Sequence, residues 1–193
     1  MALRDKVIEE AEKWVGYLEK ASNSQLESKT ANAGYNNYTI FAKLYKEYFG
    51  EDFQAQPWCA MFVSDMIYIG CGKKEVVPHF AYCPDGVNWF KRNGLWKTSK
   101  PQRGDVIFFR GSDGLVCHVG LVSSASSEKV VTIEGNTSSQ NGVVANGGCV
   151  AKKSYSIYYS RILGYGQPPY AKYESAKPTT PTKPEEKKED EEM

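Results

Sequence analysis

The sequence predicts an α+β fold in which N-terminal helices pack on a small antiparallel β-sheet. Up to about residue 90, apolar side chains recur at helical spacing, whereas from residue 105 onward they alternate at strand-like spacing. The strand-like segments are short and consecutive, and turn residues such as Asn141-Gly142 separate them. Helices followed by consecutive strands indicate an α+β fold with an antiparallel sheet.

Capping and breaking residues set the expected bounds of the helices. Pro57 can precede a helix because its missing N–H costs nothing there, and a glycine such as Gly70 ends one. Asn36 and Asn37 are residues that cap a helix N-terminus. We therefore expect helices over residues 3–20, from the cap at Asn36-Asn37 to Gly50, from Pro57 to Gly70, and from Pro84 to Asn93-Gly94.

The expected strands cover residues 105–109, 118–123, 129–134, 149–158 and 161–165. The second and third of these are separated by a short polar segment, so we expect them to form a hairpin. Pairing Ser123 with Lys129 places Leu121 opposite Val131 and Val119 opposite Ile133. This register gives the hairpin one apolar face, as a protein core requires.

Composition and charge indicate one domain followed by a tail. Residues 1–170 have enough apolar and aromatic content to fill a core, in a chain that is 41% hydrophobic. Residues 171–193 are rich in Pro, Thr, Lys and Glu, which predicts a disordered linker or tail. The formal charge of +1, without a basic block, gives nucleic-acid binding no electrostatic support. No apolar segment is long enough to insert stably in a membrane.

The N-terminus and the cysteines indicate where the chain is made and what it does not bind. Charged residues occur within the first four positions and no apolar signal core follows, so we expect synthesis in the cytoplasm without a signal peptide. The five cysteines contain no Cys-x-x-Cys pair, which argues against a disulfide framework or a four-cysteine zinc site. We expect neither a metal nor another cofactor.

Cys59 is the candidate nucleophile. It lies in the first turn of the helix that follows Pro57, where free N–H groups and the positive end of the helix dipole meet. These conditions lower the pKa of a thiol and favour the nucleophilic thiolate. A buried structural cysteine is the alternative that position alone leaves open.

His118 and Glu134 are the candidate base and its orienting carboxylate. In the predicted hairpin they lie opposite each other on one face, with Cβ atoms roughly 5 Å apart. A carboxylate at that distance holds an imidazole in one tautomer and stabilises its charged form. Asn136, two residues further on, shares that face if the strand continues. An ordinary cross-strand pair is the alternative, but a thiol, a base and an orienter together are the parts of a cysteine hydrolase.

The other histidine and a metal site offer weaker alternatives. His79 follows Pro78 in a loop and has no evident partner in the sequence, so we interpret it as a loop residue or a cleft wall. A zinc site built from both histidines lacks supporting ligand spacing.

Four motifs follow one another along the chain: Pro57–Ser64, Arg103–Phe109, His118–Val122 and Thr132–Thr137. Together they resemble the CHAP family, the cysteine, histidine-dependent amidohydrolases/peptidases. The resemblance covers about residues 5–170, and a closing Ile162–Tyr170 segment is similar to the end of such domains in phage endolysins. It implies a papain-like fold in which Cys59 is the nucleophile, His118 the base, Glu134 its orienter and Asn136 an accessory polar group.

The resemblance implies a peptidoglycan hydrolase of the endolysin type. Such an enzyme cuts an amide bond of the stem peptide or the muramoyl-alanine linkage, acts as a monomer, and reaches the wall after release through a membrane lesion. A thiol peptidase or amidase with a non-wall substrate and an inactive wall-binding module are the alternatives. Trp58 and Gln56 are candidates for substrate binding, and core packing is the alternative for Trp58. Gln54 or Gln56 is a candidate oxyanion donor. Residues 50–55 lack the regular oxygen ligands of the calcium loop found in some members.

Overall fold

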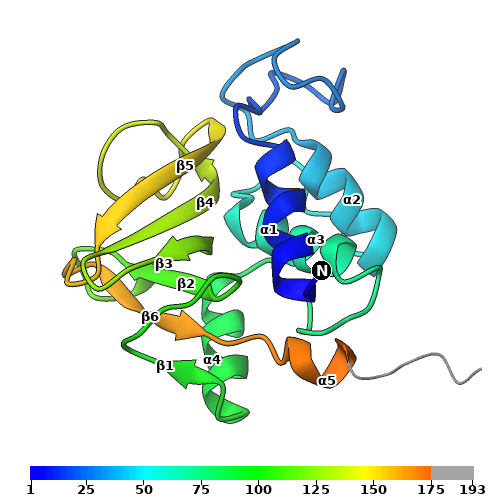
Figure 1. The fold of residues 1–193 in the computed structure, drawn as a ribbon. Coiled ribbons are helices and arrows are strands. Elements are labelled where there is room, and N and C mark those ends of the chain that lie inside the picture. Colours follow the sequence, from blue (N-terminus) through cyan, green and yellow to red (C-terminus); the bar gives the residue numbers. More distant parts are fainter. Residues whose placement is uncertain (175–193) are drawn as a thin grey trace, which may run out of the picture.

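The computed structural model describes residues 1–174, which form a group of helices beside a six-stranded antiparallel sheet (Figure 1). This confirms the predicted α+β class. The helices are α1 (Leu3–Lys13), α2 (Ile40–Phe49), α3 (Cys59–Gly70), α4 (Cys83–Arg92) and α5 (Tyr170–Glu174), and the strands are β1 (Trp96–Lys97), β2 (Val106–Arg110), β3 (Val116–Ala125), β4 (Lys129–Thr137), β5 (Cys149–Ser156) and β6 (Ile162–Gly166).

The sheet has the order β1-β6-β2-β3-β4-β5, and every neighbouring pair is antiparallel. Strands β2, β3 and β4 therefore lie in its centre. β1 was not predicted, because two residues are too few to show alternation. Within residues 1–174, no helix combines the length and apolar character that crossing a membrane requires.

Helix α3 is the element that joins the helical part to the sheet. It contacts α1 and α2 on one side and β3 and β4 on the other (Figure 1). Nearly all of its residues are buried. This agrees with its sequence, since a helix that is apolar on all sides is buried in the protein interior. Gly135 in β4 allows the close approach, since a Cβ there would lie 2.7 Å from the Cβ of Phe62. The start of α3 is thus fixed against the middle of the sheet.

Two helices begin or end away from their predicted positions. α1 ends at Lys13 rather than at residue 20, because Gly16 adopts a left-handed φ of 88° and the chain turns. α2 is capped by Thr39, whose Oγ1 accepts a hydrogen bond from Ala42 N at 3.1 Å, and not by Asn36-Asn37. Gly50 ends α2 as predicted, with a left-handed φ of 84°.

The first four residues of the predicted tail, 171–174, belong to a helix. Tyr170–Glu174 form α5, and the buried Tyr170 hydroxyl donates to Gly104 O at 2.9 Å. The α5 helix also meets α1, where Leu3 N donates to a Glu174 carboxylate oxygen. The remainder of the predicted tail, residues 175–193, lies outside the described residues.

Asp65, in the middle of α3, is a buried acid without a hydrogen-bond partner among residues 1–174. Burial raises the pKa of this carboxyl well above its usual range. The folded state therefore favours the protonated acid, and the free energy of unfolding falls as pH rises above the unfolded-state pKa of about 3.9.

We expect Asp65→Asn to stabilise the protein at pH 7 by about 1 kcal/mol or more, because the amide does not ionise. The gain should shrink toward pH 4, where both side chains are neutral. Urea unfolding at several pH values measures it, with exposed Glu9→Gln as the control substitution. Parallel pH dependences for the variant and the wild type would show that Asp65 is not a buried titrating group.

Candidate active site

Cys59 is the first residue of α3 and opens into a cavity of about 210 Å³. It is 5% exposed. The residue before α3, Trp58, provides no side-chain cap, so the first N–H groups of the helix remain available at the thiol. The cavity is lined by Pro57, Cys59, Ala81, Tyr82, Cys83, Pro84, Val116, Cys117 and Ala145.

His118 and Glu134 form the predicted pair inside the protein. His118 Nε2 lies 2.9 Å from Glu134 Oε2, and both side chains have no exposed surface. Because the carboxylate engages Nε2, and Nδ1 has no hydrogen-bond partner among the described residues, Nδ1 is the ring nitrogen that can accept the proton of the Cys59 thiol. The structure thus brings the nucleophile, the base and the orienter together at the contact of α3 with β3 and β4.

The predicted hairpin register is wrong by two residues, yet the predicted pair survives. Leu121 lies opposite Ile133 rather than Val131, and a bulge interrupts the pairing between Val122 and Ser124. A shift of two residues keeps every side chain on its original face because strands have a period of two. His118 therefore reaches Glu134 diagonally rather than directly across the pair.

Small and polar neighbours hold Glu134 in place. Gly120 lies against it, and a Cβ at residue 120 would come within 2.6 Å of Glu134 Cγ. Thr132 Oγ1 donates to Glu134 Oε1 at 2.6 Å, and Thr137 Oγ1 lies 3.5 Å from Oε2. Lys153 Nζ, buried on β5, donates to Thr137 Oγ1 at 3.3 Å. The carboxylate is therefore oriented from both sides.

The three groups shift one another's protonation. A hydrogen bond with Cys83, and interactions with His118, hold the pKa of Cys59 well below its usual range against the effect of burial. Although burial disfavours its charged form, interactions with Cys59 and Glu134 raise the pKa of His118 to about 9. The pair therefore favours a thiolate beside an imidazolium at neutral pH.

We expect the alkylation of Cys59 by iodoacetamide to persist at pH values well below the usual thiol range. The thiolate is the reactive form, and a lowered pKa keeps it populated as pH falls. Peptide mass mapping after timed alkylation measures the rate at each cysteine. Cys149 is the internal control, since burial raises the pKa of its thiol. A Cys59 midpoint at or above that of Cys149 would contradict the ion pair.

The remaining predicted residues occupy different surroundings. Trp58 is completely buried, stacks on Phe41 with ring centroids 5.3 Å apart, and donates its Nε1–H to Glu19 at 2.9 Å. The prediction that Trp58 contacts substrate is therefore wrong, and its side chain belongs to the core. Asn136 is buried at a left-handed φ of 53°, and its side chain has no hydrogen-bond partner among the described residues. It therefore does not bond His118 or Glu134.

The two glutamines also differ in their surroundings. Gln54 bonds both backbone groups of Thr39, at 2.9 and 3.0 Å, which assigns it to the scaffold. Gln56 is exposed and lines a second cavity that meets the Cys59 cavity. Of the two candidate oxyanion donors, only Gln56 has a free amide beside the cleft.

Sequence reasoning missed Cys83, Thr132 and Lys153. Cys83 Sγ lies 3.8 Å from Cys59 Sγ, but nothing in the sequence indicates that α4 begins against α3. Thr132 could have been identified from the sequence, because it lies two residues before Glu134 on the same strand face. Lys153 pairs with Thr132 across β4 and β5, and predicting that contact requires the register of β5. Within residues 1–174, no three His, Cys, Asp or Glu side chains are grouped to hold a metal ion.

Comparison with known proteins gives a family match. The CHAP domain family model matches residues 51–136, a segment that contains Cys59, His118 and Glu134. A search of curated proteins gives no match. The solved structure titled "The crystal structure of Ly7917" has a TM-score of 0.48 and 14% sequence identity, and the alignment covers 88% of this chain and 63% of that one.

Proposed function

Because this chain belongs to the CHAP family through its residues 51–136, with the papain-like α+β fold of that family, we propose that it is a peptidoglycan hydrolase of the endolysin type. The family is one of amidase/peptidase-type hydrolases that act on peptidoglycan. The observation that carries the proposal is the buried Cys59–His118–Glu134 arrangement, which lies inside the matched segment and opens into a cavity. As an endolysin-type enzyme, it would reach the wall after release through a membrane lesion.

The proposed reaction is acyl transfer through a thioester. The Cys59 thiolate attacks an amide carbonyl of the stem peptide or the muramoyl-alanine linkage, and the carbonyl oxygen becomes an oxyanion. N–H groups at the start of α3, with Gln56 as a further donor, stabilise that oxyanion. His118, protonated beside the thiolate, gives its proton to the leaving amine as the C–N bond breaks.

The second half of the cycle is hydrolysis of the thioester. Neutral His118 takes a proton from water, which attacks the acyl carbon and releases the thiolate and a carboxylic acid. Glu134 remains ionised throughout. Hydrogen bonding to His118 lowers its pKa even though burial opposes its charge, and it stabilises each imidazolium that forms.

Digestion of purified peptidoglycan with identification of the new ends tests this function. Walls from several Gram-positive species are incubated with the wild type, and the soluble products are analysed by mass spectrometry. New free alanine amino termini identify an amidase, whereas cuts in the stem or cross-bridge identify an endopeptidase. New reducing sugar ends, or no products from any wall, would contradict the proposal, and in the second case peptide substrates unrelated to the wall are tested next.

A further inference from the structure

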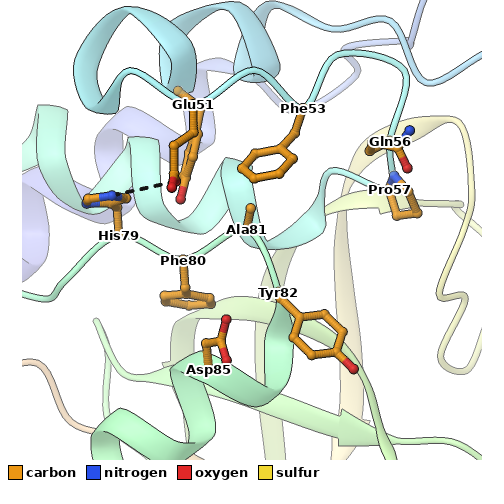
Figure 2. Close-up of a pocket in the computed structure, with 10 residues that line it drawn as sticks. Glu51, Phe53, Gln56, Pro57, His79, Phe80, Ala81, Tyr82 and Asp85 are labelled. Carbon is orange, nitrogen blue, oxygen red and sulfur yellow. Dashed lines mark ion pairs between the residues drawn. The ribbon is translucent and has the colours of Figure 1, made fainter.

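A cavity of about 490 Å³ adjoins the Cys59 cavity and takes no part in the reaction steps above. It lies between the segment after α2 and the segment that leads into α4 (Figure 2). Pro57, Ala81 and Tyr82 line both cavities. A substrate whose scissile bond lies at Cys59 therefore has a continuous path into this second space.

The walls of this cavity are largely aromatic. Tyr45 and Phe80 are buried, and Phe53 packs edge-on against Tyr45 with ring centroids 5.9 Å apart. Tyr82 is 65% exposed and lines both cavities (Figure 2). Aromatic surfaces of this kind pack against methylene groups and attract cations to their ring faces. The cavity is also larger than a bare ammonium group requires, so it suits an aliphatic chain that ends in a charge.

The charge of the cavity is negative. Glu51 and Asp85 contribute carboxylates from opposite sides (Figure 2), and no Lys or Arg is among the described residues that line it. His79 is already paired, with Nδ1 at 2.6 Å from Glu75 and Nε2 at 3.9 Å from Glu51. Asp85 is exposed in the first turn of α4, and its carboxylate has no hydrogen-bond or ion-pair partner among residues 1–174. An unpaired carboxylate beside aromatic rings favours a cationic ligand.

We propose that this cavity is a specificity subsite for a free aliphatic ammonium group of the substrate peptide. Asp85 and Glu51 bind the ammonium, and the aromatic walls pack against the methylenes that carry it. The proposal rests on the proposed function, under which the ligand is an un-cross-linked stem peptide with a lysine-type side chain. A side chain that carries an additional free carboxylate, as diaminopimelate does, is disfavoured by the negative charge.

Binding to an inactive protein tests the subsite without catalysis. In the Cys59→Ala background, calorimetry compares an N-terminally acetylated L-Ala-D-isoglutamine-L-Lys-D-Ala peptide with the same peptide acetylated on the lysine amine. We expect acetylation of the amine to weaken binding by about tenfold or more, as loss of a charge-assisted hydrogen bond does. Asp85→Asn should remove most of this difference, and the exposed control Glu9→Gln should retain it. Equal affinities, or binding of neither peptide, would overturn the subsite.

Cleavage of the two peptides by the wild type separates the failure of the subsite from the failure of the function. If both peptides are cut at the same rate, the enzyme acts on stem peptides and the subsite is wrong. If neither these peptides nor any wall is cut, the proposed function itself is wrong. Faster cleavage of the free amine, with the preference lost in Asp85→Asn, supports both.

A different observation concerns Cys83. Its Sγ lies 3.8 Å from Cys59 Sγ, both thiols are buried, and each cysteine is the first residue of its helix. We infer that Cys83 is a positioning residue whose S–H donates to the Cys59 thiolate. A second thiol at this distance orients the nucleophile in the cavity and stabilises its charged form.

Alanine and serine substitutions distinguish this role from simple packing. Cys83→Ala removes the donor, and we expect the midpoint of the Cys59 alkylation rate against pH to rise by about one unit, which slows alkylation below that midpoint by about tenfold. Cys83→Ser supplies an O–H donor and should restore most of the rate. Circular dichroism confirms that both variants fold. An unchanged pH dependence in Cys83→Ala, or equal slowing in both variants, would overturn the role.

Discussion

Cys59→Ala is expected to reduce the rate of wall hydrolysis by about 10⁴-fold or more. The nucleophile, base and orienter act as a unit. Removing the nucleophile therefore leaves only the rate enhancement from substrate binding and oxyanion stabilisation. The substitution removes one sulfur atom at the edge of a cavity, so the fold should be retained. Clearing of wall suspensions, followed as turbidity, measures the loss.

Cys149→Ala is the matched control for this substitution. Cys149, on β5, is partly buried, and its thiol donates to Thr137 O at 3.2 Å, outside the Cys59 cavity. The control should clear walls at close to the wild-type rate. If Cys59→Ala also retained that rate, the thiol would not be the nucleophile.

His118→Ala is expected to reduce the same rate by about 10²–10⁴-fold, the usual contribution of a general acid–base group. In the wild type, the pKa of His118 is raised to about 9, so the imidazolium that protonates the leaving amine is lost as pH rises through that value. The wild-type rate should therefore fall above about pH 9, whereas the residual rate of the variant should not show this decline. Rate measurements from pH 5 to pH 10 test both statements.

Added imidazole provides a chemical check on His118→Ala. The substitution leaves a buried space next to Glu134, and a free imidazole that enters it can carry the same proton. We expect the clearing rate of the variant to rise with imidazole concentration and that of the wild type to stay constant. A variant that clears at the wild-type rate without imidazole would exclude His118 as the base.

The core of the candidate site was predictable because it depends on two simple periodicities. Helical spacing after Pro57 places Cys59 in a first turn, and alternation places His118 and Glu134 on one strand face. The face was correct although the register was not, since the pairing at Leu121 and Val122 is displaced by two residues from the predicted one. Face assignments tolerate such a shift, but distances across the pair do not.

Other parts of the site depend on contacts between elements that are distant in the sequence. The approach of Cys83 to Cys59 depends on how α4 packs on β3, β1 and β6 of the sheet. The place of Lys153 behind Glu134 depends on the register of β5. For Trp58, the position in the sequence was misleading. Its position next to the nucleophile suggests a cleft residue, but the aromatic cluster with Phe41 buries it completely. Sequence neighbours on a helix point in different directions, and only the packing shows which of them faces solvent.

The most direct test of the central claim titrates Cys59 with iodoacetamide while wall clearing is followed in the same samples. Peptide mass mapping gives the fraction of Cys59 that is alkylated at each time. We expect the wild type to clear Gram-positive walls at a rate proportional to the unmodified fraction of Cys59. The rate should reach zero when alkylation at that residue is complete. Protein that still clears walls with Cys59 fully alkylated would contradict the thiolate mechanism.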